Sequence, residues 1–343
     1  MSHKFVADVG GTNIRLARVT ETGVADIIKY MCNDFASIDL AIAQYFADLP
    51  QYAFTEGCIA IACPVLGDQV EMTNHSWAFS QNALRSQLKL DALYVINDFT
   101  AVAHSLPVLS DEQVVQIGEG TAKANGNIAV FGPGTGLGVE HITMTSSGWQ
   151  TLDGEGGHVD FAPVDETDVI VWRHLQATFG RASAEEVMSG RGIHNIYTAL
   201  ANNAGEPVTF ADPAQITEAA IAGTCKIAEA TLTQFCRIMG SFAGNLALNM
   251  ATTGGIFIGG GIANRFPEFI KNSDFRARFE AKGQMKHYVK DIPIFWICSL
   301  SSGIDPQKIN KLPKRNRSKM PVCPPNCPPL AYGIEVLMAA MSE

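Results

Sequence analysis

The chain has 343 residues, is 47% hydrophobic and 17% charged, and carries a formal net charge of -9. This length supports a large core and two domains, and an acidic surface repels phosphate backbones, so we expect no nucleic-acid partner. The N-terminus lacks a signal-peptide pattern, and no stretch reaches the roughly 18 apolar residues of a membrane span. The eight cysteines show no paired spacing. We therefore predict a cytoplasmic protein with no membrane partner.

The first section of the chain alternates strand and helix patterns. A glycine turn at 10–13 joins two short apolar runs, which is the pattern of a hairpin. The run at 57–63 reads GCIAIAC, as expected of a strand buried on both faces. We predict strands at 5–9, 14–19, 27–32, 57–63 and 93–98, and helices at 37–49 and 80–88.

A second section follows Pro107 and repeats part of this order. A strand at 128–131, a glycine turn at 132–138 and a strand at 139–144 again give strand, turn, strand, which is a weak internal repeat. Together with the first section, these patterns predict a mixed α/β protein. We predict further strands at 255–258 and 292–298, and helices at 164–179, 184–202, 213–222, 224–250 and 266–289.

The turn after the first strand reads DVGGTN, from Asp8 to Asn13. Glycine permits positive φ and close approach to a ligand, and consecutive backbone N–H groups in such a turn form an anion-binding nest. Asp8 would then be placed to hold a hydrated Mg²⁺. An ordinary hairpin turn explains the same residues equally simply.

The second turn, GPGTGLG at 132–138, has four alternating glycines around Thr135, more than a hairpin turn needs. This pattern favours phosphate binding. Both turns lead into strands, so neither is a P-loop, and neither is the turn of a dinucleotide-binding site. Two such hairpins indicate a nucleotide held between two halves of the chain. A third glycine turn, at 259–261, either lies against an adenine ring or makes a tight strand-to-helix turn.

The run LYVI at 93–96 ends in Asn97 and Asp98, and a helical pattern follows. A carboxylate at the end of a buried strand is held firmly and faces a crevice, where it can accept a proton from a hydroxyl. The alternative is that Asp98 merely caps the following helix, which Asp does well.

A polar loop at 153–160, DGEGGHVD, places four ionisable residues among three glycines. Glu155 and His158 could exchange hydrogen bonds with a polyol, although a solvated loop has the same composition. No cysteine lies nearby, and the spacing matches no standard zinc site. Further on, Ser183 starts a capping-box pattern, so Glu185 is either a first-turn helix carboxylate or a ligand group.

Together these residues resemble bacterial glucokinases of the hexokinase, Hsp70 and actin superfamily. The resemblance is ordered from residue 3 to about 297. The cysteine-rich zinc motif of the ROK branch of sugar kinases is missing after His158, so we predict a non-ROK type without structural zinc. The matching segments are DVGGTNIRLA (8–17), GCIAIACPV (57–65), MTNHSWAFS (72–80), INDFTAVA (96–103), GPGTGLGV (132–139), GEGGHVDFAP (154–163), SAEEVMSG (183–190), GNLALN (244–249) and GGIFIGGGI (254–262).

The resemblance implies two ribonuclease-H-like (actin-like ATPase) α/β domains with a cleft between them, a small one at 1–107 and a large one at 108–298. It implies ATP- and Mg²⁺-dependent phosphorylation of the glucose 6-hydroxyl, the entry step of glycolysis, by a homodimer. Asp98 would be the general base. Sugar contacts would come from Asn97, Asp98, Glu155, His158 and Glu185, with Asn74 and His75 nearby. The phosphates and Mg²⁺ would lie at Asp8, Gly10, Gly11, Thr12, Gly134, Thr135 and Gly136, and the adenosine at Gly260.

The chain departs from the family pattern after residue 298. Residues 308–319 hold six Lys or Arg, and residues 321–329 hold five Pro. Family members instead continue into a glycine-containing turn and a final helix that returns to the small domain. Residues 333–341 would supply a substitute helix, or the segment reflects an altered reading frame. A second function class, a catalytically silent sugar-binding regulator on the same scaffold, is expected to carry a preceding helix-turn-helix, and the first phosphate turn begins already at Asp8.

Overall fold

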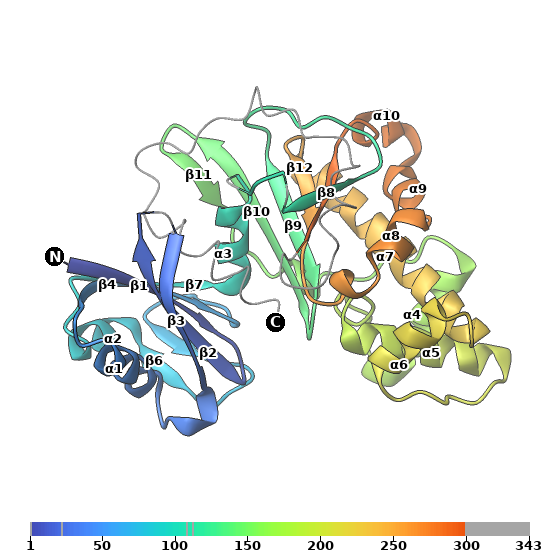
Figure 1. Ribbon diagram of the computed structural model, residues 1–343. Coiled ribbons are helices and arrows are strands. Elements are labelled where there is room, and N and C mark those ends of the chain that lie inside the picture. The colour runs from blue at the N-terminus through green and yellow to red at the C-terminus, as the bar shows by residue number, and fades with distance from the viewer. Residues whose placement is uncertain (1, 22, 108, 112, 299–343) are drawn as a thin grey trace.

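The computed structural model describes residues 2–21, 23–107, 109–111 and 113–298 (Figure 1). The expectations for 299–343, including a helix at 333–341 that returns to the small domain, lie outside the described residues.

The first sheet has the strand order β3-β2-β1-β4-β7. β1 and β2 form the predicted hairpin, in which Asp8 lies opposite Arg15, and β1 runs parallel to β4. Apolar side chains on one face of this sheet pack against α1 (Ile38–Asp48), with Tyr45 fully buried. The strands are β1 (Ser2–Val9), β2 (Asn13–Thr20), β3 (Gly23–Met31), β4 (Ala53–Ile61) and β7 (Ala92–Asn97).

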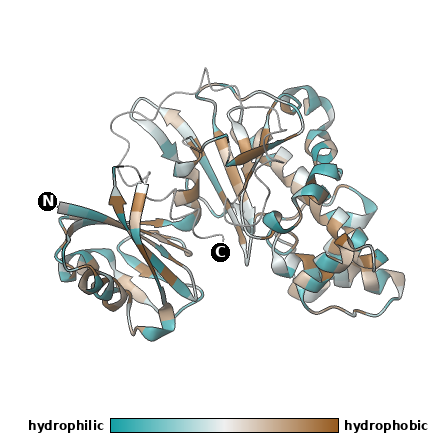
Figure 2. Cartoon of the chain, in the orientation of Figure 1, coloured by the Kyte–Doolittle hydropathy of each residue, from teal (hydrophilic) through white to brown (hydrophobic). Residues whose placement is uncertain are grey.

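The second sheet has the order β11-β10-β9-β12-β13-β8. Its β9–β10 hairpin and the parallel pairs β9–β12 and β12–β13 repeat the pairing of the first sheet, so the predicted internal repeat is confirmed in the strand order. Figure 2 shows hydrophobic residues concentrated along the strands of both sheets. The strands are β8 (Val114–Ile117), β9 (Ile128–Pro133), β10 (Leu137–Thr145), β11 (Gly148–Thr151), β12 (Gly255–Ile258) and β13 (Ile294–Ile297).

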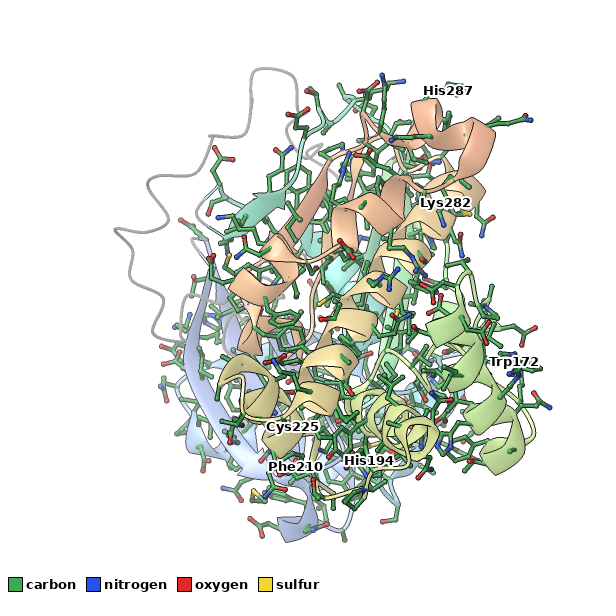
Figure 3. All side chains as sticks on the ribbon, turned by 90° about the vertical axis from the view of Figure 1, so that its right-hand side faces the viewer. Trp172, His194, Phe210, Cys225, Lys282 and His287 are labelled. Carbon is green, nitrogen blue, oxygen red and sulfur yellow. The ribbon has the colours of Figure 1, made fainter. Side chains whose placement is uncertain are left out.

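A layer of helices covers one face of the second sheet (Figure 1). Its central member is α7 (Lys226–Met250), in which Gly240 and Gly244 allow the backbone of α9 to approach closely. Figure 3 looks onto this layer, where Lys282 donates hydrogen bonds to Ser241 O and Asn245 Oδ1 of α7. The other helices of the layer are α4 (Glu166–Phe179), α5 (Gly190–Ala204), α6 (Pro213–Ile221), α8 (Pro267–Asn272), α9 (Phe275–Glu280) and α10 (Lys286–Val289).

One short helix, α3 (Asp98–Ser105), lies between the two sheets (Figure 1). Ala101 packs with residues of β1, β2 and β4 in the first sheet. Val102 and Ala103 pack with residues of β9 and β10 in the second sheet. Because both faces of α3 are buried against different sheets, any shift of α3 would disturb both, and the residue at its start is held in place from two sides.

Several predicted elements need correction. The helix expected at 184–202 begins at Gly190, because Ser189 Oγ accepts a hydrogen bond from Gly192 N at 3.1 Å and so caps it, which removes the cap role of Ser183. The helix expected at 266–289 is broken into α8, α9 and α10, with extended backbone at Ser273 between the first two. The sequence analysis missed four short strands: β8, β11, β5 (Gln69–Glu71) and β6 (Ala78–Ser80). Each has three or four residues, too few to show a period.

Candidate functional site

Asp98 lies where β7 ends and α3 begins. The N-cap position belongs to Asn97, whose Oδ1 accepts a hydrogen bond from Phe99 N at 2.8 Å. Asp98 Oδ1 also accepts from Phe99 N, at 2.9 Å, so capping is shared and the expectation that Asp98 is the cap residue itself is wrong. Asn97 Nδ2 donates to Cys63 O at 3.2 Å, which ties the ends of β7 and β4 together. Asp98 therefore sits on a braced junction.

The pKa of Asp98 is raised to about 6, mainly by burial and to a smaller extent by the negative charge of Glu155, against backbone hydrogen bonds that lower it. Asp8 is 5% exposed, and burial likewise raises its pKa to about 6. Arg15 Nη1, at 3.1 Å from Asp8 Oδ2, opposes that rise, whereas the charge of Asp98 adds to it. The charge of Asp98 thus affects the pKa of Asp8, and the charge of Glu155 affects that of Asp98, although the three acids come from separate segments. Such a region favours both a proton acceptor and a bound cation.

The first hairpin turn lies against the segment around Asn74. A Cβ built on Gly11 would lie 3.0 Å from Asn74 Cβ, so close packing requires glycine there. Neither Gly10 nor Gly11 adopts positive φ, and the argument from positive φ is therefore wrong for this turn. Thr12 is exposed at the tip, where its carbonyl accepts a hydrogen bond from Cys32 N at 2.8 Å.

Asn74 and His75 differ in their surroundings. Asn74 borders the first hairpin, as described for Gly11. The His75 ring bonds Asn33 Oδ1 at 3.2 Å through Nε2, and accepts from Trp77 N at 3.3 Å through Nδ1. Asn74 is therefore next to the candidate phosphate turn, while both ring nitrogens of His75 already form hydrogen bonds within the protein.

The glycines of the second hairpin have two different roles. Gly132 and Gly138 are paired across β9 and β10, and a Cβ on them would lie 2.6 and 1.9 Å from the Phe99 ring. These two glycines are therefore required for packing under α3, which corrects the view that phosphate binding explains all four. Gly134 has no contact closer than 3.8 Å from a built Cβ, and Thr135 is exposed at the tip. Gly134 and Thr135 remain the accessible part of the turn.

Glu185 lies in a turn before α5 and not in the first helical turn, so that alternative is wrong. Its Oε2 accepts a hydrogen bond from Leu137 N at 3.0 Å, and a Cβ on Gly136 would lie 2.6 Å from the same oxygen. Its Oε1 lies 3.4 Å from Arg191 Nη2. Glu185 N donates to Gly157 O at 2.9 Å. Glu185 therefore joins the second hairpin to the polar loop.

The polar loop contains a short 3-10 turn, Gly156–His158, that lies directly on the start of β10. A Cβ on Gly157 would lie 2.1 Å from Leu137 O. Glu155 and His158 are both exposed, and His158 N donates to Glu155 O at 3.0 Å, so the two side chains share one turn. The structure thus brings Glu155, His158 and Glu185 to one neighbourhood around the opening of the second hairpin, and their role toward sugar stays a prediction.

The third glycine turn borders the second hairpin as well. Gly260 has φ +85, and a Cβ there would lie 2.4 Å from Pro133 O. Gly259 N donates to Phe131 O at 2.9 Å. The tight-turn interpretation is therefore confirmed for Gly260, and contact with adenosine stays a prediction.

Sequence reasoning missed Arg15 and Glu140. The hairpin register could have revealed Arg15, because a turn at 10–13 puts it opposite Asp8. Glu140 is 3% exposed on β10, and a charged residue inside a predicted strand of the second sheet is itself a signal. Among the described residues, no group of three or more His, Cys, Asp or Glu is arranged to hold a metal. No helix in the described part of the chain is long and apolar enough to cross a membrane.

Known proteins are similar to this chain in sequence and in fold. The family model described as Glucokinase matches residues 5–306. A glucokinase of Colwellia psychrerythraea is 46% identical over 307 residues, covering 88% of this chain and 93% of that protein. The crystal structure of a glucokinase from an Antarctic psychrotroph has a TM-score of 0.80 and 37% identity, and covers 87% of this chain and 94% of its own.

More distant structures share the fold. The glucokinase from Balamuthia mandrillaris, solved in complex with glucose, has a TM-score of 0.74 at 19% identity, and covers 87% of this chain and 90% of its own. The match of the family model over most of the chain and the identity to the Colwellia protein decide the family. This chain belongs to the glucokinase family.

Proposed function

We propose that the chain transfers the γ-phosphoryl group of ATP to the 6-hydroxyl of glucose, with Asp98 as the general base. The observation that carries this proposal is Asp98 itself, a half-buried acid with a pKa of about 6, next to the capping residue Asn97 and within reach of the charge of Glu155. Membership of the glucokinase family supports the choice of sugar. A coupled assay of glucose 6-phosphate formation with ATP, Mg²⁺ and a panel of hexoses tests it.

In the proposed reaction, the ionised Asp98 carboxylate takes the proton of the 6-hydroxyl as its oxygen attacks the γ-phosphorus. The bond between that phosphorus and the β-γ bridging oxygen breaks, so ADP leaves, and Asp98 later returns its proton to water. Asn97, Glu155, His158 and Glu185 would orient the sugar. Asn97 can do so while braced, because its amide has a second N–H and a second lone pair.

Accessible backbone at the two hairpins would hold the phosphates: Gly10, Gly11 and Thr12 in the first, and Gly134, Thr135 and Gly136 in the second. Asp8 fits a role toward Mg²⁺ because it is a carboxylate, which suits Mg²⁺. Burial is the main cause of its raised pKa, and the charge of Asp98 adds a smaller rise that a cation would offset. Bound with ATP, Mg²⁺ neutralises charge on the phosphates. Gly260 would border the adenosine.

We further propose that the two sheets belong to two ribonuclease-H-like domains, residues 1–107 and 108–298, with the substrates in a cleft between them. The repeated strand order supports this division, as does the placement of the hairpins in different sheets. We expect a cytoplasmic homodimer. A regulator that binds glucose without turnover is the rival function, and retention of Asp98 at a braced junction favours the kinase.

The pH dependence of turnover follows from the raised pKa of Asp98. The base must be ionised to accept a proton, so activity is expected to fall as the pH drops below about 6. We expect kcat/KM for glucose to drop roughly tenfold per pH unit on this acid limb. Measuring kcat/KM for glucose as a function of pH, at saturating ATP, tests this acid limb. Because burial gives Asp8 a pKa in the same range, the profile of Asp8→Asn serves as the comparison. A flat wild-type profile through this range contradicts the assignment.

Removing the Glu185 carboxylate is expected to weaken glucose binding. In Glu185→Ala, the sugar would lose a charged acceptor and Leu137 N would lose its partner, so we expect KM for glucose to rise about 10- to 100-fold. Glu185→Gln keeps an acceptor for Leu137 N and should lose less. Calorimetric glucose titrations of both variants make the comparison, with Arg191→Ala as the variant that keeps the Glu185 carboxylate and removes the ion pairs of Arg191 with Glu185 and Glu186. Wild-type affinity in Glu185→Ala would mean that Glu185 braces the hairpin without touching sugar.

A further inference from the structure

A cluster of three polar residues lies behind α3, two of them buried and the third, Asp153, exposed. Glu140 on β10 is 3% exposed, and Thr100 on α3 is 6% exposed. Thr100 Oγ1 donates to Glu140 Oε2 at 3.0 Å and lies 3.4 Å from Asp153 Oδ1. A hydroxyl has a single proton, so Thr100 cannot fully satisfy two carboxylates at once. The cluster therefore lacks a proton when both acids are ionised.

The missing proton belongs on one of the two acids. Burial is the main cause that raises the pKa of Glu140 to about 7, and the charge of Asp153 and a hydrogen bond with it contribute to that rise. Two hydrogen bonds, from Thr100 and from His141 N at 2.7 Å, act in the opposite direction. A protonated Glu140 donates to Asp153 and accepts from Thr100, which completes the cluster. A fully ionised cluster places a buried charge on Glu140 next to the like charge of the exposed Asp153.

The position of this cluster links it to the proposed chemistry. Thr100 stands two residues after Asp98 on α3, and Asp153 stands two residues before Glu155. Glu140, on the sheet between them, contacts both segments. The cluster therefore connects the helix that carries the proposed base with the loop that carries proposed sugar ligands.

We propose that Glu140 is a positioning residue for phosphoryl transfer: in its protonated form it ties Thr100 to Asp153, and so holds Asp98 and Glu155 at their working separation. This inference rests on the proposed roles of those two residues. Loss of the proton places like charges on β10 and the polar loop, which drives the loop away from α3. We therefore expect activity to fall at alkaline pH because the KM for glucose rises.

Other titratable groups around Glu140 do not supply a compensating charge. His104, on the next turn of α3, has a pKa that burial lowers from 6.5, against the charge of Asp153, which raises it. It is therefore uncharged in the alkaline range where Glu140 loses its proton. His141 follows Glu140 on β10 but lines a cleft with α7 residues on the other face of the sheet, and burial lowers its pKa too.

The test compares Glu140→Gln with Glu140→Ala. The Gln amide donates to Asp153 and accepts from Thr100 at every pH, so it mimics the protonated acid. Ala removes the link, and a shift of the base by about an ångström can cost about 100-fold in rate. For this reason we expect kcat/KM for glucose to be about 10- to 100-fold lower in Glu140→Ala than in the wild type. Glu140→Gln should keep most of the wild-type value. Thermal melts of both variants report folding.

The pH profile separates positioning from a merely structural role. We expect the wild-type KM for glucose to rise above about pH 7, and the rise to vanish in Glu140→Gln. Asp153→Asn should also abolish it, because its amide donates to an ionised Glu140. An unchanged alkaline rise in Glu140→Gln, with glucose phosphorylation intact, overturns this proposal alone. Absence of glucose phosphorylation in the wild type overturns the proposed function with it.

Discussion

Replacing Asp98 with Asn is expected to lower kcat by about 10²- to 10⁴-fold, the usual contribution of a general base. The amide has nearly the same shape and keeps an oxygen for Phe99 N, so the start of α3 should persist. Glucose should still bind, because Asn97, Glu155, His158 and Glu185 are untouched.

The same substitution should not destabilise the fold. A carboxyl whose pKa is raised by burial holds its proton more tightly in the folded state than in the unfolded state, so it disfavours folding once it is ionised above about pH 6. A neutral amide removes that penalty. We therefore expect the Tm of Asp98→Asn at neutral pH to equal or exceed that of the wild type.

A coupled assay, glucose calorimetry and thermal melts, run side by side, check these outcomes. Asp91→Asn, at an exposed acid just before β7, is the matched control and should leave all three unchanged. Near-normal turnover in Asp98→Asn would show that the base lies elsewhere. Loss of glucose binding together with activity would show that Asp98 belongs mainly to the sugar ligands.

Gly138→Ala is expected to be severe for a different reason. The added methyl would lie 1.9 Å from the Phe99 ring, well inside contact distance, so either the ring or α3 must move. Overpacking of this kind typically costs about 1–3 kcal/mol, and the burial of α3 between two sheets leaves it little room to yield. Since α3 carries Asp98 at its first position, we expect a lower Tm and reduced kcat together.

Gly134→Ala is the control from the same turn, because its Cβ meets nothing closer than 3.8 Å. It should keep the wild-type Tm and, as part of the proposed phosphate site, raise KM for ATP. Adding Phe99→Ala to Gly138→Ala should give less destabilisation than the sum of the two single changes, since the removed ring makes space for the methyl. Equal Tm values for Gly134→Ala and Gly138→Ala would contradict the packing explanation.

The stability of the helix layer is a separate matter from the site. Arg278 Nη2 lies 2.6 Å from Asp168 Oδ2, and Asp168 is fully buried. A buried ion pair of this kind anchors α9 to α4 far from Asp98, so substitutions there should affect folding before catalysis. This contrast is useful when variants of the proposed site are compared.

Local patterns were enough to predict many elements of the fold. The apolar run at 57–63 overlaps β4, and the two glycine turns lead into strands because a hairpin depends on a few adjacent residues. The start of α5 was misplaced because Ser183 begins a capping-box pattern, whereas the helix is capped by Ser189, which has no such pattern after it. Short strands such as β8 depend on pairing with strands from elsewhere in the chain, so no local pattern of hydrophobic residues predicts them.

By itself, the sequence determined the mixed α/β class, the repeated hairpin pattern and a site list headed by Asp98, because these depend on local periodicity, turn chemistry and family motifs. Only the tertiary structure decided which glycines are required for packing under Phe99, and that Glu185 bonds the second hairpin rather than beginning a helix. It also brought Glu140, Thr100 and Asp153 together from three segments. The two contacts of Thr100, for example, join residues 40 and 53 positions apart, and no local signal in the chain encodes which distant side chain will fill the space beside another.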